Sequence, residues 1–324
     1  MVNRIVLSRL VRVATLVAVG VAIVYYRHEL WRSLVEITNL GAIVLLVLPL
    51  FLLWNWVASF AWLDLHTRLT TGSVPSVWKL SLIRMQAQAV NLIVPMASVG
   101  GEILRSAILS KQTGQTAGTT SAVLLDKIAD SAAGVLFALL GVLLALSQGI
   151  DSSPTTTIVL ASMSASSVLL VPFALRMLST HLGRRESRLA LSLAPIFETP
   201  GRISVGFYRA MAWHMAERIL MAGEIYLAML ATGISAGPID VLFITAILTA
   251  YSLVFFFVPG QVGAIEAGII SAFASLGLPT SAGLTIALVR RARQLFVVAA
   301  AMALWGIRRR QEELLVPIEP EDVP

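Results

Sequence analysis

The chain has 324 residues with a formal net charge of +6; 57% of the residues are hydrophobic, 13% are charged and none is cysteine. Soluble domains are about 25% charged, so this composition excludes an ordinary soluble enzyme or binding domain, and the missing cysteine excludes disulfides and thiolate sites. The arginines stand mostly at the ends of apolar segments, as in membrane proteins, so we expect no nucleic-acid partner.

Seven apolar segments are predicted to be transmembrane helices, because each approaches or exceeds the roughly 20 residues that cross a hydrocarbon core of about 30 Å. The first is predicted to be retained, because it ends in Tyr25, Tyr26 and Arg27 rather than in a small-residue cleavage site. We therefore expect an all-α, polytopic integral membrane protein with seven or eight crossings. The seven segments cover residues 11–26, 41–63, 117–147, 156–178, 211–232, 239–258 and 281–307.

The loop of residues 179–210 is the most basic connection, whereas the short connections near Asp151 and at 233–238 contain no lysine or arginine. The positive-inside rule therefore predicts that the N-terminus and the 179–210 loop are cytoplasmic. The tail of residues 311–324 is acidic and contains proline, which predicts disorder. Residues 1–310 are left as a single transmembrane domain.

Two further apolar segments, 85–112 and 259–279, are interrupted by proline and glycine. Such breaks survive in lipid only inside protein or beside a wet cavity, so we predict re-entrant or discontinuous helices; greasy surface loops are the alternative. A cytoplasmic arginine cluster at 308–310 requires an even number of crossings, which favours 259–279 as an eighth one. The interrupting residues are Asn91, Pro95, Gly100 and Gly101 in the first segment and Pro259, Gly260 and Gly263 in the second.

The two broken segments resemble each other at a constant offset of 164 residues. We interpret residues 85–147 and 250–307, approximately, as copies of an internal repeat; chance similarity in a chain so rich in alanine, valine and leucine is the alternative. Paired broken segments in two halves are the best sequence pointer to a transporter's substrate site. The offset relates Pro95 to Pro259, Glu102 to Glu266, and Asp126-Lys127 to Arg290-Arg291.

Charged residues inside apolar helices are costly, at roughly 2.5–3.5 kcal/mol each. Because opposite charges on separate helices relieve one another's desolvation, we expect an acidic and a basic group to face each other across one cavity. Ion pairs that only stabilise the fold are the alternative. The acidic group is Glu102, Asp126 and Asp130, and the basic group is Arg290, Arg291 and Arg293.

A third polar cluster comprises His214, Glu217 and Glu224, with Arg218 beside them. Glu224 lies near the middle of its predicted span without a partner in its own helix. We interpret His214 as an interfacial histidine, although a ligand or a proton shuttle stays open. The four histidines are isolated in sequence and no Walker or Rossmann motif occurs, so we expect no metal and no cofactor.

These motifs, in this order, resemble the flippase-like membrane domain of lysylphosphatidylglycerol synthases over about residues 10–310. The run Arg290-Arg291-Ala292-Arg293-Gln294, with Trp213-His214 and Glu224-Ile225-Tyr226, is most similar to the stand-alone branch linked to hopanoid biosynthesis. Asp126-Lys127 departs from the family's usual Glu-Arg, and Pro259-Gly260-Gln261 departs from Pro-Gly-Gly. The resemblance rests on Asn91, Pro95, Gly101, Glu102, Arg105, Asp126, Lys127, Asp130, Pro259, Gly260, Gly263 and Glu266.

The resemblance implies movement of a lipid between the leaflets of a bacterial inner membrane. Since the soluble aminoacyl-transfer domain of the full synthases is not present in this sequence, we do not expect aminoacylation of lipid. The residues implied to be functional are Glu102, Arg105, Asp126, Lys127, Asp130, Glu266 and Arg290.

We therefore predict a lipid transporter or flippase in which the broken segments line a polar cavity. Arg290, Arg291 and Arg293, with Arg105, would hold an anionic headgroup, and the carboxylates would balance these charges or carry a coupled proton. One alternative is a membrane-embedded enzyme with Glu102, Asp126 or Asp130 as general base. The other is a non-catalytic subunit of a lipid-synthesis complex. The expected partner is a membrane lipid; lipid-biosynthesis enzymes and a homo-oligomer stay open.

Overall fold

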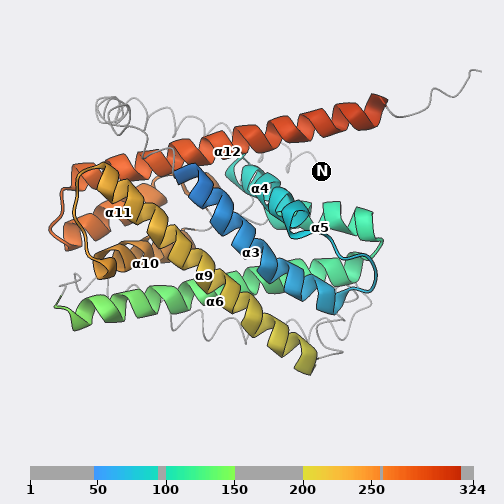
Figure 1. Cartoon of the computed structure of the whole chain (residues 1–324), viewed down its shortest axis with the longest axis horizontal. Helices are drawn as coiled ribbons and strands as arrows, with labels where there is room; N and C mark the ends of the chain where they lie inside the picture. Colours follow the sequence, from blue (N-terminus) through green and yellow to red (C-terminus); the bar gives the residue numbers. More distant parts are fainter. Residues whose placement is uncertain (1–46, 94–99, 150–199, 256–257, 315–324) are drawn as a thin grey trace, which may run out of the picture.

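The computed structural model describes residues 47–93, 100–149, 200–255 and 258–314, which are almost entirely helical and contain no strand (Figure 1). The all-α prediction is therefore confirmed for these ranges. Pro95 and the predicted spans 11–26 and 156–178 lie outside them. The helices are α3 (Val47–Leu69), α4 (Val77–Ile93), α5 (Gly100–Thr113), α6 (Thr116–Ser147), α9 (Pro200–Ala231), α10 (Pro238–Val254), α11 (Ala264–Ser275) and α12 (Thr280–Leu314), with a 3-10 turn, η2 (Pro259–Gln261).

Two of the described helices, α3 and α6, are long and apolar enough to cross a membrane, while α10 and α11 are apolar but shorter. The predicted span 117–147 matches α6 closely, and 41–63 overlaps α3, which continues to Leu69. Helix α12 continues to Leu314, so the first four residues of the tail predicted to be disordered are helical.

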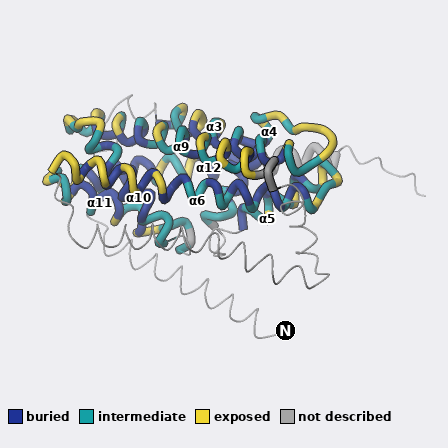
Figure 2. The backbone as a smooth tube through the Cα atoms, turned by 90° about the horizontal axis from the view of Figure 1, so that it is seen from below, coloured by how far each residue is buried: buried dark blue, intermediate teal, exposed yellow. Residues whose placement is uncertain are grey.

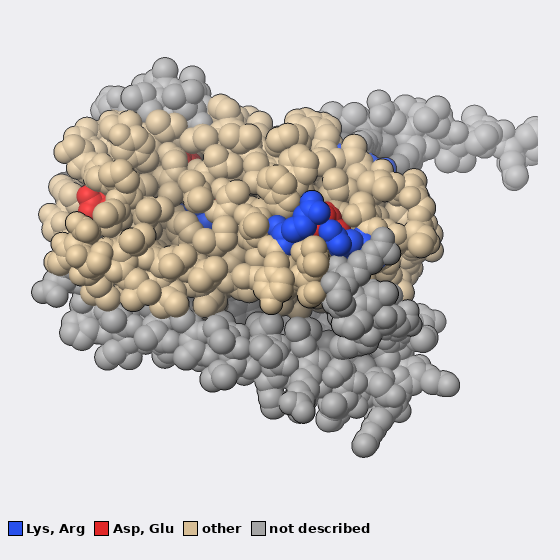
Figure 3. Space-filling view, turned by 60° about the horizontal axis from the view of Figure 1, so that its bottom comes forward, with Lys and Arg blue, Asp and Glu red and all other residues tan. Residues whose placement is uncertain are grey.

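The outer surface of α6 is a stripe of leucines. Leu136, Leu139, Leu140, Leu143 and Leu144 are all exposed, at the spacing that places side chains on one helix face. The face of the molecule drawn in Figure 3 bears few charged side chains outside one cluster. Contiguous apolar patches of this kind are rare on soluble monomers, so hydrocarbon is the natural surroundings of this surface.

Each broken segment forms a helical hairpin. In the first, a Cβ placed on Gly101 of α5 would lie 2.5 Å from the backbone oxygen of Ala87 in α4. In the second, a Cβ on Gly268 of α11 would lie 3.2 Å from Cβ of Tyr251 in α10. Both glycines therefore let the returning helix approach the helix before the break.

Residues 259–279, the segment favoured as an eighth crossing, form the turn η2 followed by the short helix α11; the crossing itself stays a prediction. Helix α11 has only 12 residues, which gives a length of about 18 Å against a hydrocarbon core of about 30 Å. Backbone breaks explain the short helix, because Gly260, Gln261 and Gly263 have φ values of 59°, 51° and 83°, in the left-handed region. Gln261 thus holds a backbone conformation that glycine prefers. It stands where the second glycine of Pro-Gly-Gly would stand in the family that this sequence resembles.

The tips of the two hairpins meet. A Cβ on Gly260 in η2 would lie 2.6 Å from Cδ1 of Leu92, two residues before the first break on the α4 side. Two of the apolar clusters in the described part of the chain lie in different groups of helices. One is built around the α10–α11 hairpin, and the other around α3, α4, α5 and α6. Exposed residues lie mainly along the outer sides of the helices (Figure 2).

Helices α6 and α10 pack closely at Gly141, which yields the first testable prediction. A Cβ there would lie 2.6 Å from Cβ of Ala246 and 3.1 Å from the backbone oxygen of Leu242. Gly141→Ala should lower the unfolding free energy in detergent by about 1–3 kcal/mol through overpacking. Gly223→Ala is the matched control, because nothing lies within 4 Å of its Cβ position. It should be neutral or stabilising by up to about 1 kcal/mol; equal losses in both variants would contradict this packing.

Candidate functional site: a charged cavity between α4, α5, α6 and α9

A cavity of about 200 Å³ lies between the first hairpin and helices α3, α6 and α9. Its charged lining residues are equal in number: the basic ones are Arg84, Arg105, Lys127 and Arg218, and the acidic ones are Glu102, Asp126, Asp130 and Glu217. The neutral lining includes Trp54, Gln88, Asn91 and Met221. Half of these charged residues, Arg84, Arg105, Asp126 and Glu217, are buried by protein, so their mutual pairing is needed to offset desolvation.

Asp126 on α6 is the centre of the buried pairs and is only 1% exposed. Its Oδ2 accepts hydrogen bonds from Nη2 of Arg105 at 2.5 Å and from Nη1 of Arg84 at 3.1 Å. Its Oδ1 lies 3.1 Å from Nε2 of His214 on α9. One carboxylate thus ties α4, α5 and α9 to α6.

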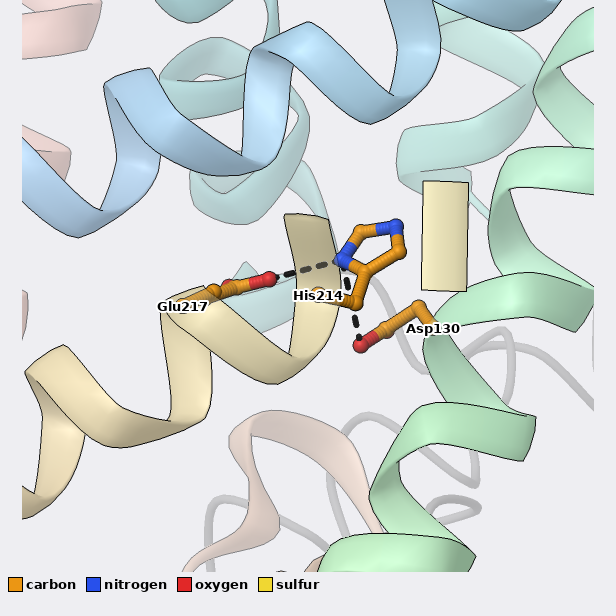
Figure 4. Close-up of side chains that lie close together, drawn as sticks. All are labelled: Asp130, His214 and Glu217. Atoms are coloured by element: carbon orange, nitrogen blue, oxygen red, sulfur yellow. Dashed lines mark hydrogen bonds and ion pairs between the residues drawn. The ribbon is translucent and has the colours of Figure 1, made fainter. Parts of the chain in front are cut away.

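His214 is completely buried, and its interpretation as an interfacial histidine stays a prediction. Its Nδ1 lies 2.7 Å from Oε2 of Glu217 and 3.8 Å from Oδ1 of Asp130, the two contacts drawn in Figure 4. The packing of α9 against α6 places the ring between these two helices. This position could not be read from the spacing of His214 relative to the basic loop.

The Asp130, His214 and Glu217 side chains offer three atoms within 4.8 Å of one another, the spacing of a metal site. However, Glu217 Oε2 and His214 Nδ1 lie at hydrogen-bond distance, and Asp130 Oδ1 already accepts from Nη2 of Arg218 at 2.6 Å. Arg84 adds a further positive charge 3.9 Å from Glu217. This cluster therefore fits a hydrogen-bonded network better than a cation site.

Glu102, Lys127 and Asp130 form the more open side of the cavity. Nζ of Lys127 lies 3.7 Å from Glu102 and 3.8 Å from Asp130, and its side chain is 44% exposed. Asn91, before the first break, accepts a 2.6 Å hydrogen bond from the backbone N–H of Gly101. The break thereby places the first turn of α5, with Glu102, at the cavity.

The predicted arginine group does not face the predicted acidic group. Arg290 and Arg293 on α12 instead both pair with the completely buried Glu224 of α9, Arg290 at 3.1 Å. Oε2 of Glu224 also accepts a 3.1 Å hydrogen bond from Nε1 of Trp54, which lines the cavity. The expectation failed because α4, α5 and α9 supply nearer partners to Asp126 and Asp130 than α12 does.

Arg291 holds the tip of the second hairpin. Its guanidinium lies 2.8 Å from Glu266 and donates to the backbone oxygens of Gly260 at 2.8 Å and Gln261 at 3.3 Å. Glu266 in turn accepts a 2.9 Å hydrogen bond from the backbone N–H of Gly263. Arg291 and Glu266 thus stabilise the break rather than line the cavity.

The structure therefore divides the predicted site residues into two sets. Glu102, Arg105, Asp126, Lys127 and Asp130 share the cavity, as does Asn91. The other set, Glu224, Glu266, Arg290, Arg291 and Arg293, does not line it. Sequence reasoning missed Arg84, Glu217 and Arg218 as cavity residues, and His214 as a buried partner of the cavity. Arg84 stands one residue before the first broken segment, so the cost of a charge inside an apolar segment did not mark it.

The family model of the lysylphosphatidylglycerol synthase TM region matches residues 10–301 of this chain. No curated protein and no solved structure matches the chain. The family match covers most of the sequence and agrees with the apolar helices and lipid-compatible surface described above. This chain is therefore a membrane protein and belongs to the family of lysylphosphatidylglycerol synthase TM regions.

Proposed function

We propose that the protein moves a membrane lipid between leaflets, with the polar headgroup entering the cavity while the apolar part stays in lipid. One observation carries this proposal: buried side chains of both signs line a cavity among apolar helices. In addition, Arg84, Arg105 and Arg218 each keep a buried Nε–H that lacks a hydrogen-bond partner within the described ranges. Such donors are suited to phosphate or hydroxyl oxygens.

The size of the cavity suits a headgroup rather than a whole lipid. Its volume of about 200 Å³ lies below the roughly 300–1,000 Å³ of drug-sized pockets. The exposed side chain of Lys127 marks the side on which a headgroup would enter.

The pairing of the carboxylates favours transport over catalysis. Asp126 accepts from two arginines, Asp130 pairs with Arg218, and Glu217 pairs with His214. A general base needs a carboxylate that is free to approach a substrate proton, whereas Asp126 and Asp130 are held by arginines. Our proposal therefore assigns no chemical step to the chain.

We infer that the two hairpins are copies of one repeat. Gly100 and Ala264, the first residues of α5 and α11, are 164 positions apart, and so are Thr116 and Thr280, which begin α6 and α12. Lys127 lies near Glu102 in the first copy, and Arg291 pairs with Glu266 at the equivalent positions of the second. Rocking of one half against the other is the motion we propose for transport.

We further propose a bacterial inner-membrane location, with the N-terminus and the 179–210 loop in the cytoplasm, as the positive-inside rule favours. The resemblance to the hopanoid-linked branch supports an association with lipid-biosynthesis enzymes. Association of the chain with itself is compatible with this proposal.

Lys127→Gln tests the headgroup site with little risk to folding, because the side chain is the most exposed of the cavity cations. We expect about a tenfold or larger loss of lipid movement in proteoliposomes, the effect of one charge-assisted hydrogen bond. Glu102→Gln should also reduce movement, and Arg290→Gln, away from the cavity, should act mainly through stability. Lys79→Gln on α4 is the control. Unchanged movement in both Lys127→Gln and Glu102→Gln would refute the proposed site.

A further inference from the structure

His214 has a carboxylate oxygen against each ring nitrogen. Glu217 Oε2 lies 2.7 Å from Nδ1, and Asp126 Oδ1 lies 3.1 Å from Nε2. A neutral imidazole carries only one N–H, so one of the two contacts would set a ring lone pair against the lone pairs of a carboxylate. A proton in each contact removes this repulsion. The geometry therefore fits an imidazolium, since imidazole is intrinsically more basic than a carboxylate.

This proton is a charge in excess of a balanced set. The four basic and four acidic side chains that line the cavity cancel one another. The cluster consequently carries one positive charge when His214 is protonated and none when it is neutral. The arginines remain charged in both states, so His214 is the group whose protonation changes.

The charged groups around His214 come from each helix of the cavity. Helix α6 contributes Asp126 and Asp130, and α9 itself contributes Glu217 and Arg218. Arg84 of α4 and Arg105 of α5 reach the ring through Asp126. On α3, which packs along α9, Asp64 pairs with Arg68 and Arg209 instead.

His214 is shielded from the cavity by carboxylates. The ring is completely buried and does not itself line the cavity, whereas Asp126, Asp130 and Glu217 do. A proton that enters from the cavity would bind a Glu217 oxygen, which would then donate it to Nδ1 and return to a carboxylate. The reverse transfer would release the proton to the cavity.

We propose that His214 carries one proton for each singly anionic, phosphodiester-type headgroup that the cavity accepts. A headgroup of charge −1 would neutralise the protonated cluster and hold the proton, and its departure would favour release. The inference rests on the proposed transport function and adds its energy coupling and the charge class of its cargo. A second buried histidine provides a matched control, since both ring nitrogens of His66 lack hydrogen-bond partners among the described residues.

The test measures movement of acyl-labelled phosphatidylglycerol in proteoliposomes, with and without a gradient of one pH unit. With one proton per lipid, the gradient should change the transbilayer distribution by about tenfold in wild type and in His66→Asn. His214→Asn should show a ratio of one. If His214→Asn fails to fold, Glu217→Gln replaces it, because this change keeps the side-chain volume. Glu217→Gln should also reduce the effect of the pH gradient on the transbilayer distribution. No gradient effect in wild type, or a full effect in folded His214→Asn, would overturn the inference.

A second readout separates the inference from the transport function. Nitrogen-15 spectra of the imidazoles in detergent at neutral pH, assigned by comparison with His214→Asn, should show both ring nitrogens of His214 protonated. If wild type moves no labelled lipid, the transport function fails for this headgroup, and the spectra decide whether His214 holds the proton. An imidazole of His214 with only one protonated ring nitrogen would refute the inference that His214 carries the proton.

Discussion

Asp126→Ala is expected to lower the unfolding free energy in detergent by about 3–5 kcal/mol, the range for breaking a buried ion pair. The carboxylate is 1% exposed and accepts from Arg84 and Arg105, so its loss removes the ion-pair partner of the buried Arg105 and leaves Arg84 only the more distant Glu217, at 3.9 Å. Arg105 would retain only its position 4.1 Å above the ring of Trp62. A denaturation curve in mixed detergent micelles measures the change.

Two variants make the Asp126 experiment specific. Arg105→Met added to Asp126→Ala should recover part of the loss, because the double variant buries one charge fewer. Asp64→Ala is the control, because both of its partners, Arg68 and Arg209, are more exposed than Arg105, with side chains 18% and 59% exposed. Water can therefore reach both guanidinium groups, and the cost should stay within about 1 kcal/mol. A small loss for Asp126→Ala would mean that water reaches the arginines and that the cluster is not desolvated.

Glu224→Gln should be equally costly, at about 3–5 kcal/mol, whereas Arg293→Gln should cost only about 1–2 kcal/mol. The asymmetry follows from two arginines sharing one carboxylate. Without Glu224, Arg290 and Arg293 are like charges with no anion; without Arg293, Arg290 and Glu224 remain a matched pair. Arg293 would lose chiefly its contacts with the rings of Phe51 and Trp54, at 4.7 and 5.7 Å.

The same denaturation measurement distinguishes these outcomes. Arg293→Gln in the Glu224→Gln background should be stabilising, since it then removes an uncompensated charge. If Arg293→Gln alone is as harmful as Glu224→Gln, each arginine has a separate anionic partner and the shared-carboxylate geometry is wrong.

Local features of the sequence predicted the helices and the positions of the breaks. Gly260 and Gly263 interrupt the second segment where predicted, and Gly114 and Gly277 close the two hairpins with φ values of 70° and 66°. These features can be predicted from the sequence because backbone freedom and apolar content are local properties of a few residues. Composition did not distinguish a hairpin from a continuous span at 259–279, because both have the same apolar content.

The partners of the charged residues around the cavity could not be predicted from the sequence. Helical spacing correctly placed Asp126 and Asp130 on one face, and burial costs marked them as needing partners. Neither helical spacing nor burial cost identified the partners of Asp126, which are Arg84, 42 residues away, and His214, 88 residues away. Nor did either show that α12 would direct its arginines to Glu224.

By itself, then, the sequence determined that the chain is helical and apolar, that it breaks at two Pro/Gly sites, and that its buried charges require compensation. Only the tertiary structure decided which charges meet, because several oppositely charged residues could satisfy each buried group electrostatically. The packing of α9 against α6 selects His214 and Arg218, and the first hairpin brings Arg84 and Arg105 to Asp126. Pairing depends on the relative placement of whole helices, which no local pattern encodes.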